Sequence, residues 1–450
     1  MTHMSAWAEY FKGRRVTVMG IDPEGRGVQD ALFAAQHGAD VIATDVKGDE
    51  ALRASLNVLR YQPSIKYRLG GHVEEDFTKV DLVIRAASAP LDSPYLTAAR
   101  NAGVAIETDE TLFLALAPPV TLVGVTGTRG KTTTTQLLYE IVHAHKPDNT
   151  FLAGNVRGAA AVPLLDAVHV GDTIVMELSS WQLQQFGEKK ISPKIAVFTT
   201  FYPDHLNYYH GSIDAYLGDK AHSFLNQAPG DTLVVSTQVL PMLQEKYWPL
   251  VRAQALVADP AKFPSGWSLK IPGAHNVLNA MCAIEAARAL NVPEESIKTA
   301  VENFKGVPGR LELIREVHGV TYYNDTTSTS PDATLAALQA LKKEGASKVI
   351  LIFGGADKTL DMSALAKVIP QLTKHAVLLA GTGADVLLAD FPSLADIQVC
   401  DRLQDAFHDA VQHASSGDSI VLSPGFASFG MFKNEYDRGD QFTALVNGLA

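Results

Sequence analysis

Short apolar runs alternate along the chain with stretches of helical spacing. The first run, residues 15–20, leads into a glycine-containing loop up to Gly27, a helical pattern over 28–38 and a second apolar run over 39–44 that ends at Asp45. A strand, a glycine turn, a helix and a second strand with a terminal acid form the order of a nucleotide-binding βαβ unit. The pattern therefore predicts an α/β domain at the start of the chain.

The same alternation returns twice, after Pro118-Pro119 and after the cluster of glycines and proline at 306–309. Runs at 172–176 and 194–199 are continuously apolar and rich in β-branched residues, which is typical of buried parallel strands, and further predicted strands lie at 120–125, 348–353 and 418–422. We predict three α/β domains in series, the third again a parallel sheet wrapped by helices. The predicted parts are a Rossmann-like N-terminal domain over 1–117, a central P-loop-type ATPase domain over 118–307 and a Rossmann-like C-terminal domain over 308–450.

Composition narrows the classes of function. The chain has 450 residues, with 38 Lys and Arg against 49 Asp and Glu, a net charge of −11. This sign argues against a general nucleic-acid binder, whose surface would be basic. Two cysteines, Cys282 and Cys400, cannot build a disulfide framework and fit a reducing compartment. No apolar run approaches the roughly 18 residues of a membrane span. We expect a cytoplasmic monomer without membrane insertion.

The sharpest motif is Thr126-Gly-Thr-Arg-Gly-Lys-Thr-Thr133, which follows a predicted strand and opens a predicted helix. Backbone N–H groups of a glycine loop at a helix N-terminus point at an anion. Lys131 would reach the β- and γ-phosphates of a nucleotide, and the Thr132 hydroxyl would bind Mg²⁺. The motif lacks a glycine at position 125 and is the shorter G-x-x-G-K-T form. It predicts phosphate binding.

Further candidates follow other predicted strands. Glu177 ends one strand, beside the phosphate loop, and is placed to hold Mg²⁺. His205 follows another strand and reads equally well as a structural residue or as a metal ligand. Lys220 lies in a helical pattern and, on spacing alone, reads as an ordinary exposed lysine.

Two groups of loops, in the first and third predicted domains, are further candidates for ligand binding. Gly20, Gly25 and Gly27 form an imperfect dinucleotide fingerprint, and Asp22 and Glu24 within it would discourage a pyrophosphate. In the third domain, segments 324–329, 354–358 and 423–428 all follow predicted strands. We expect them to converge on one anionic ligand, because the carboxyl ends of parallel strands meet at one edge of a sheet.

These residues together resemble the Mur ligase family, and the resemblance covers nearly the whole chain. It is carried by the phosphate loop, Glu177-Leu-Ser-Ser-Trp-Gln182, Asp204-His205, Gly273-Ala-His-Asn276 with Asn279, Arg310-Leu-Glu312, Asn324-Asp325, Gly354-Gly-Ala-Asp-Lys358 and the segment from Ser423 to Asn434. The last segment is most similar to the family member that adds D-glutamate.

The resemblance implies an activity. It implies an ATP-dependent ligase of peptidoglycan precursor synthesis that joins D-glutamate to UDP-N-acetylmuramoyl-L-alanine through an acyl phosphate, with ATP and Mg²⁺ at two sites. It also implies that Lys220 is carbamylated and supplies a carboxylate to the second metal site.

The site residues that the resemblance implies fall into four groups. Catalytic residues would be Lys131, His205 and Lys220. Residues for ATP would be Gly127, Thr128, Arg129, Gly130, Lys131, Thr132, Thr133, Asn276, Arg310 and Asp325. Metal ligands would be Thr132, Glu177, His205 and Lys220. Substrate contacts would be Asp45, Lys47, Asn155, Ser179, Gln182, Thr329, Lys358, Ser428 and Phe429.

The chain departs from the family pattern at Thr327, where lysine is usual, and at Gly309, where histidine is common. A folylpolyglutamate synthetase would share the central and last domains but would normally lack the domain over 1–117, and three further alternatives stay open at this point. They are a Mur ligase for another amino acid, an NAD-dependent oxidoreductase built on the first βαβ unit, and a catalytically silent UDP-sugar-binding homologue. Lys131 in a second phosphate loop argues against the oxidoreductase.

Overall fold

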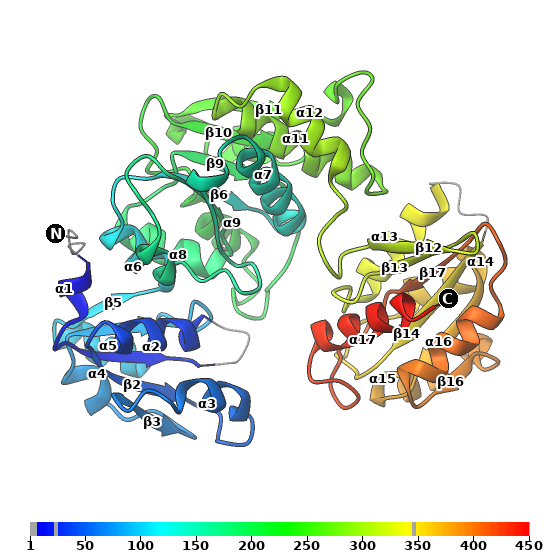
Figure 1. Cartoon of the computed structure of the whole chain (residues 1–450), viewed down its shortest axis with the longest axis horizontal. Helices are drawn as coiled ribbons and strands as arrows, with labels where there is room; N and C mark the ends of the chain where they lie inside the picture. Colours follow the sequence, from blue (N-terminus) through cyan, green and yellow to red (C-terminus); the bar gives the residue numbers. More distant parts are fainter. Residues whose placement is uncertain (1–6, 22–25, 344–347, 450) are drawn as a thin grey trace. The chain divides into compact units, whose positions relative to one another are not determined.

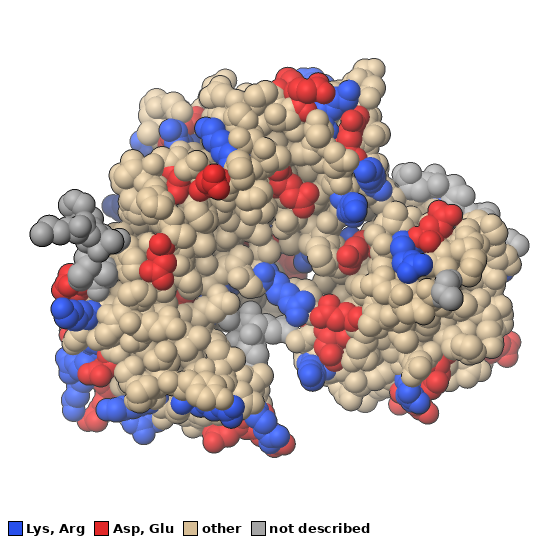
Figure 2. All heavy atoms as spheres, viewed as in Figure 1, with Lys and Arg blue, Asp and Glu red and all other residues tan. Residues whose placement is uncertain are grey.

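The computed structural model describes residues 7–21, 26–343 and 348–449, and Figure 1 shows the chain from its N-terminal to its C-terminal part. The chain divides into two compact units, Met1–Ala261 with Leu278–Ile297 and Lys262–Val277 with Lys298–Ala450. Within the described ranges, every helix is too short or too polar to cross a bilayer. On the face drawn in Figure 2, basic side chains lie among acidic ones rather than in one stripe.

The first sheet has five parallel strands in the order β3-β2-β1-β4-β5. Its strands are β1 (Arg15–Met19), β2 (Asp40–Asp45), β3 (Ile65–Leu69), β4 (Leu82–Arg85) and β5 (Ala105–Glu107). Its helices are α1 (Ala8–Phe11), α2 (Gly27–Gln36), α3 (Arg53–Leu59), α4 (Glu75–Thr78), α5 (Pro94–Asn101) and α6 (Asp109–Leu116). The strand order reverses between β1 and β4, and ligands of doubly wound sheets bind outside the carboxyl ends at such a point.

The second sheet has six parallel strands in the order β11-β10-β9-β6-β8-β7. The strands are β6 (Thr121–Thr126), β7 (Thr150–Gly154), β8 (Thr173–Glu177), β9 (Ile195–Phe198), β10 (Thr232–Ser236) and β11 (Gln254–Ala258). The helices are α7 (Lys131–His145), α8 (Ser180–Lys189), α9 (Ile213–Ala221), α10 (Leu240–Lys246), α11 (Ala274–Ala289) and α12 (Glu294–Asn303), with 3₁₀ turns at η1 (Pro147–Asn149), η2 (Val162–Asp166), η3 (Trp248–Leu250) and η4 (Pro260–Lys262).

The first two sheets share buried apolar surface. One hydrophobic cluster contains Val18 of β1, Phe113 of α6, Leu165 of η2, Ile174 of β8 and Phe186 of α8. Burial of this kind stabilises by about 25 cal/mol per Å² of apolar surface. The shared cluster explains why both sheets belong to one compact unit, and the predicted boundary at residue 117 remains a prediction.

The third sheet has six strands in the order β12-β13-β17-β14-β15-β16. They are β12 (Glu312–Val317), β13 (Val320–Asn324), β14 (Lys348–Gly354), β15 (Thr373–Leu379), β16 (Gln398–Cys400) and β17 (Asp418–Leu422). The helices are α13 (Pro331–Lys343), α14 (Ser363–Leu372), α15 (Thr382–Asp390), α16 (Leu403–Gln412) and α17 (Glu435–Asn447), with η5 at Pro392–Leu394.

Two core clusters cover opposite faces of this third sheet. Leu351 and Phe353 of β14 pack into one cluster, whereas Ile350 and Ile352 of the same strand pack into the other. Burial on both faces is the reason that β14 reads as a continuous apolar run. The α/β fold class and its parallel sheets are confirmed.

The prediction of a wholly parallel third sheet is wrong at one edge. β12 pairs with β13 in antiparallel orientation. The two-residue connection consists of His318 (φ +51°) and Gly319 (φ +77°), and two consecutive positive φ values are the geometry of a tight hairpin turn. This turn reverses the chain directly, with no crossover helix between the two strands.

Candidate functional site

The phosphate loop runs from the end of β6 to the start of α7 and is fixed by the segment that follows β9. The Thr128 N–H donates to the carbonyl of Thr200 at 2.7 Å, and the Arg129 N–H donates to the Thr200 hydroxyl at 2.9 Å. The hydroxyls of Thr199 and Thr200 both donate back to the Arg129 carbonyl. These bonds occupy the N–H groups of Thr128 and Arg129 and the Arg129 carbonyl. The N–H groups in the first turn of α7 provide an anion site.

Glycine is required at two positions of this loop. Gly127 (φ +149°) and Gly130 (φ +83°) adopt backbone conformations that residues with a Cβ rarely adopt. A Cβ at Gly127 would lie 2.1 Å from Thr199 Oγ1, and a Cβ at Gly130 would lie 2.1 Å from Asn279 Oδ1. The two glycines therefore set the path of the loop and the start of α7.

The first turn of α7 carries the polar side chains of the motif. The Lys131 ammonium donates to the Thr128 carbonyl at 3.0 Å, which folds the side chain back over the loop. Thr132 and Thr133 follow it and are half-buried. A lysine over such a loop places a positive charge where phosphate oxygens would lie.

Glu177 ends β8 and is buried. Its Oε1 accepts a hydrogen bond from Asn155 Nδ2 at 3.0 Å, whereas its Oε2 is buried and has no hydrogen-bond partner among the described residues. A buried carboxylate oxygen without a donor is costly, and Mg²⁺ prefers oxygen ligands of this kind. The donor set at Glu177 thus fits a divalent cation.

Lys220 lies in α9 with its side chain fully buried, so the exposed position that spacing alone suggests is wrong. Its Nζ donates to the Gly127 carbonyl at 2.8 Å and lies 4.8 Å from the ring centre of Tyr216. Burial, followed by the charge of Lys131, lowers the pKa of Lys220 well below its ordinary value. The amine is therefore held beside the phosphate loop in a setting that favours its neutral form.

His205 lies in the loop after β9 at a positive φ of 52°, and its side chain is 41% exposed. Its ring packs 4.8 Å from that of Trp181. Burial lowers the pKa of His205, and the charges of Lys131 and Lys220 lower it further against the opposing effect of Asp204. His205 is thus within electrostatic reach of both lysines, and its neutral ring can bind a metal.

A cavity of about 390 Å³ opens at the carboxyl ends of β1, β2 and β4. Asp45, Lys47, His72 and Arg85 are among its lining residues. The Asp45 carboxylate accepts hydrogen bonds from the N–H groups of Ile21 and Lys47, both at 2.9 Å. Asp45 and Lys47 therefore share one cavity, whereas Asp22 and Glu24 of the adjoining loop lie outside the described residues.

The three loops of the third sheet meet as expected. The Gly354 N–H donates to the Pro424 carbonyl at 2.9 Å, the Gly425 N–H donates to the Ser328 carbonyl at 2.8 Å, and Ala356 pairs with Ala427 in a short bridge. These bonds join the ends of β13, β14 and β17 into one rim.

The predicted residues of this rim differ in exposure. Lys358 Nζ donates to Thr329 Oγ1 at 2.9 Å. Ser428 is buried, Phe429 is 70% exposed and Arg310 is exposed. The rim thus offers one ammonium, two hydroxyls and an exposed aromatic ring as candidate ligand contacts.

Three predicted ligand contacts lie in the protein interior. Asp325 is buried; its Oδ1 accepts from the Leu311 N–H at 2.9 Å and its Oδ2 from the Ser423 hydroxyl at 2.6 Å. Burial raises the pKa of Asp325 to about 6. Asn276 is also buried and donates from Nδ2 to the Pro272 carbonyl at 2.7 Å.

Gln182 is the third of these interior residues. Its side chain is fully buried; its Oε1 accepts from the Ser179 N–H at 2.7 Å, and its Nε2 donates to Glu110. Ser179 and Gln182 form a capping box at the start of α8, which explains their spacing. In this structure Gln182 joins α8 to α6, and its predicted contact with a substrate stays a prediction.

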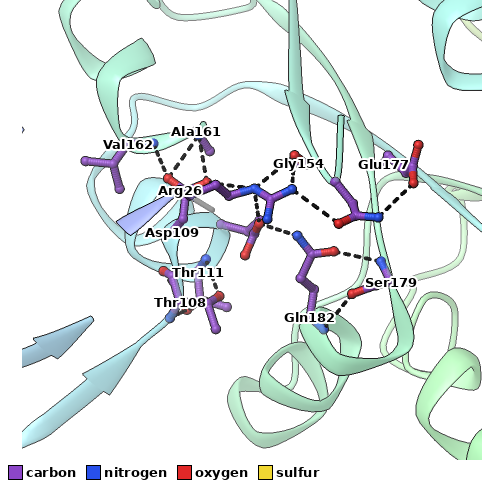
Figure 3. A network of polar contacts seen from close by, with 12 residues as sticks. Arg26, Thr108, Asp109, Thr111, Gly154, Ala161, Val162, Glu177, Ser179 and Gln182 are labelled. Carbon is purple, nitrogen blue, oxygen red and sulfur yellow. Dashed lines mark hydrogen bonds and ion pairs between the residues drawn. The ribbon is translucent and has the colours of Figure 1, made fainter. Parts of the chain in front are cut away.

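Sequence reasoning missed a polar network at the junction of the first two sheets, which Figure 3 shows around Arg26 and Asp109. Asp109 is buried and accepts hydrogen bonds from the N–H groups of Ala161 and Val162. Burial, followed by the charge of Glu110, raises the pKa of Asp109 to about 6. The sequence carries no motif for this network beyond an arginine inside the first glycine loop.

A second group of potential metal ligands lies between β15 and α16. His375 Nε2 is 2.6 Å and His413 Nδ1 is 3.5 Å from Asp409 Oδ1. The two rings stack 3.8 Å apart and only 16° from parallel. A bound metal lies near the plane of each imidazole, so one cation cannot satisfy two stacked rings. The arrangement is that of a hydrogen-bonded cluster around Asp409.

The fold and the site define a class of protein. Residues 125–246 match the Mur ligase middle domain, and residues 309–426 match the domain described as Mur ligase, glutamate ligase domain. The chain belongs to the Mur ligase family.

The chain is similar over nearly its full length to individual members of the family. The chain is 38% identical to a UDP-N-acetylmuramoylalanine–D-glutamate ligase of Roseiflexus sp. (strain RS-1), over 97% of this chain and 99% of that protein. It is 33% identical to the protein of the same name from Borreliella afzelii (strain PKo), over 97% and 98% of the two chains.

Solved structures show the same fold. The UDP-N-acetylmuramate–alanine ligase MurC of Thermotoga maritima superposes with a TM-score of 0.61 at 20% identity, covering 96% of this chain and 99% of that one. The MurF ligase of the same organism, solved with ADP, gives a TM-score of 0.55 at 16% identity, covering 90% and 93%. At these identities the likeness concerns the fold alone.

Proposed function

We propose that this chain catalyses the ATP-dependent addition of D-glutamate to UDP-N-acetylmuramoyl-L-alanine, a ligation in peptidoglycan precursor synthesis. The observation that carries the proposal is the phosphate loop beside Glu177 and Lys220, in a chain that aligns over 97% of its length with two ligases named for this reaction. In the reaction, a carboxylate oxygen of the alanyl group attacks the γ-phosphate of ATP and ADP leaves. The amine of D-glutamate then attacks the acyl carbon, and phosphate leaves.

The chemical difficulty of the first step is that a carboxylate and a triphosphate repel each other. Lys131 and the N–H groups of the α7 terminus neutralise charge where the γ-phosphate would lie, in a place that is already fixed by the bonds to Thr200. Donors that are held in place before the reaction stabilise the developing charge without reorganisation, an effect worth about 3–4 kcal/mol for a single donor in other enzymes.

Glu177, Thr132 and His205 would hold Mg²⁺, which supplies charge neutralisation and alignment of the phosphate oxygens. The unpartnered Oε2 of Glu177 supports this assignment, as does the half-buried Thr132, the residue that follows Lys131 in the first turn of α7. His205 would serve a second ion, together with Lys220.

A second ion needs an anionic ligand, which Lys220 supplies once it is carbamylated. The neutral Lys220 amine attacks the carbon of CO₂, forms an N–C bond and releases one proton, and the product is a carbamate with two oxygens. The buried position of the amine, 2.8 Å from the Gly127 carbonyl, supports this chemistry because only the unprotonated nitrogen is a nucleophile.

The outer domains would hold the two substrates. The UDP moiety fits the 390 Å³ cavity at the first sheet, where Asp45 and Lys47 lie. The carboxylates of D-glutamate fit the rim of the third sheet, where Lys358 provides an ammonium and Thr329 and Ser428 provide hydroxyls.

The experiment measures the release of phosphate from ATP in the presence of Mg²⁺ and UDP-N-acetylmuramoyl-L-alanine. The rates are compared among D-glutamate, L-glutamate, L-alanine, meso-diaminopimelate and L-lysine as the added amino acid. Release stimulated by D-glutamate alone is expected. Stimulation by another amino acid would keep the ligase chemistry and overturn the assigned substrate. Absence of release with all of them would favour a silent UDP-sugar-binding homologue. Thr327→Lys, which restores the lysine that is usual in the family, would then be the first substitution to make.

Lys220→Ala tests the carbamate. We expect loss of turnover that is partly rescued by acetate, because a free carboxylate can occupy the place of the missing one. Full activity of the variant without acetate would refute the metal role of Lys220.

A further inference from the structure

Arg26 joins the cavity at the first sheet to the central sheet. It is the residue before α2, lines the 390 Å³ cavity and is 22% exposed at its side chain. Its Nε donates to the Gly154 carbonyl at 2.9 Å, and its Nη2 also donates to that carbonyl. Figure 3 shows the guanidinium reaching from Asp109 toward Gly154, with Glu177 on the far side.

From Gly154 the contacts continue to the proposed cation ligand. Arg26 Nη2 lies 3.4 Å from Asn155 Oδ1, and Asn155 Nδ2 donates to Glu177 Oε1 at 3.0 Å. The Asn155 N–H also donates to the Glu177 carbonyl at 2.9 Å. An amide whose oxygen faces a guanidinium must turn its NH₂ group toward the carboxylate, so Arg26 fixes which way round Asn155 lies.

Arg26 also lies beside buried carboxyl groups. Its Nε lies 3.4 Å from Glu110 Oε1 and 3.8 Å from Asp109 Oδ2, and all three carboxyl groups of this junction, Asp30, Asp109 and Glu110, are buried. The planar fork of arginine can serve acceptors on two sides at fixed angles, which the single ammonium of lysine cannot do. The Nε that lies near these carboxyl groups also donates to Gly154, and Nη2 reaches both Gly154 and Asn155, so the acidic groups hold in place the same edge of the guanidinium that contacts Gly154 and Asn155.

We propose that Arg26 is a positioning residue for the cation site: it orients Asn155, and Asn155 holds the Glu177 carboxylate so that Oε2 stays open toward the ion. The inference rests on the proposed function insofar as Glu177 binds the cation. Residues behind a metal ligand typically change metal affinity by about 10- to 100-fold when removed, and Arg26 acts one contact further away.

The same contacts connect the two sites thermodynamically. Because Arg26 lines the cavity and also orients Asn155, an anionic occupant of the cavity that attracts the guanidinium changes the affinity of the cation site. By linkage, the cation changes the affinity of that occupant by the same factor.

The test is binding of Mn²⁺ to the full chain in the presence of a non-hydrolysable ATP analogue, followed by the EPR signal of free Mn²⁺. We expect Arg26→Ala to weaken Mn²⁺ binding about tenfold, and Asn155→Ala to weaken it at least as much. Arg26→Lys should recover little, because it keeps the charge and loses the fork. The double variant Arg26→Ala/Asn155→Ala should bind Mn²⁺ as Asn155→Ala does, since both act through one path.

Arg15→Ala is the matched control, because Arg15 pairs with Asp81 on the same sheet at an exposed position away from this network. It should leave Mn²⁺ binding unchanged, and the thermal unfolding of all variants shows whether the chain remains folded. Binding within twofold of wild type in Arg26→Ala, or additive losses in the double variant, would overturn the inference.

Phosphate release separates this result from the proposed function. Ligase activity without an effect of Arg26→Ala on Mn²⁺ binding overturns the role of Arg26 alone. An effect on Mn²⁺ binding in a chain that releases no phosphate overturns the ligase assignment and supports Arg26.

Discussion

Replacing Gly130 by alanine tests the geometry of the phosphate loop. Gly130 has φ +83°, and an alanine Cβ there would lie 2.1 Å from Asn279 Oδ1 and 3.0 Å from Asn279 Cγ. The left-handed backbone costs about 1 kcal/mol for a residue with a Cβ, and displacing a buried side chain costs about 1–3 kcal/mol more. Asn279 is 4% exposed, so it cannot move aside into solvent. Gly130→Ala should therefore destabilise the unit by about 2–4 kcal/mol.

Gly158 provides the matched control. It has φ +72°, and no atom lies within 4 Å of the place that an alanine Cβ would take, so Gly158→Ala should cost only the backbone penalty of about 1 kcal/mol. Adding Asn279→Ala to Gly130→Ala removes the clashing atoms and should recover about 1–3 kcal/mol relative to additivity. Urea unfolding followed by circular dichroism and tryptophan fluorescence gives the free energies. Equal losses for Gly130→Ala and Gly158→Ala, or strict additivity with Asn279→Ala, would refute the steric argument.

Three other substitutions test other parts of the molecule. Lys131→Ala should lower kcat at least 100-fold with an unchanged circular dichroism spectrum, because one preorganised charge is lost; near-normal kcat in phosphate release would contradict its role. Asp325 has its pKa raised by burial from 3.8 to about 6, so its folded form binds more protons between these values and stability falls as pH rises through that window. Asp325→Asn should reduce the fall in stability between pH 4 and 6.5, measured by urea unfolding, by about 2 kcal/mol. An unchanged pH dependence would show that another group titrates. Arg438 is fully buried and donates to the Thr326 carbonyl at 3.0 Å and the Thr326 hydroxyl at 3.2 Å. Arg438→Met should therefore lower the free energy of unfolding by about 3 kcal/mol. A loss under about 1 kcal/mol in the same urea assay would contradict the structural role of Arg438.

The sequence predicted best those elements whose environment is uniform along their length. β14 and β17 are buried on both faces, and the apolar runs at 349–353 and 420–422 within them are readable in the sequence. Edge strands are marked less clearly by the hydrophobic pattern of the sequence. In β3, three of five residues are exposed, and β16 has only three residues. The hairpin of β12 and β13 was also not predicted from the sequence, because a His-Gly turn has the same composition as many loops.

The phosphate loop could be predicted because its chemistry is local. Gly127, Gly130 and Lys131 lie within five positions of the chain, and their backbone requirements leave a readable motif. Lys220 is different, because its burial depends on how α9 packs against a loop 93 residues earlier in the chain. The place of Gln182 is likewise decided by Glu110, 72 residues away, which no local spacing reveals.

The rim of the third sheet, where we propose that D-glutamate binds, has a consequence for attempts to change amino-acid specificity. Its three loops are tied through Gly354 to Pro424, Gly425 to Ser328 and Ala356 to Ala427, and a Cβ at Gly355 would lie 2.2 Å from the Ala427 carbonyl oxygen. A loop transplanted alone would lose its main-chain partners on both neighbours. On the proposed role of the rim, redesign or natural divergence of amino-acid specificity must therefore exchange the three segments as one set, because single substitutions leave the main-chain links between them unchanged.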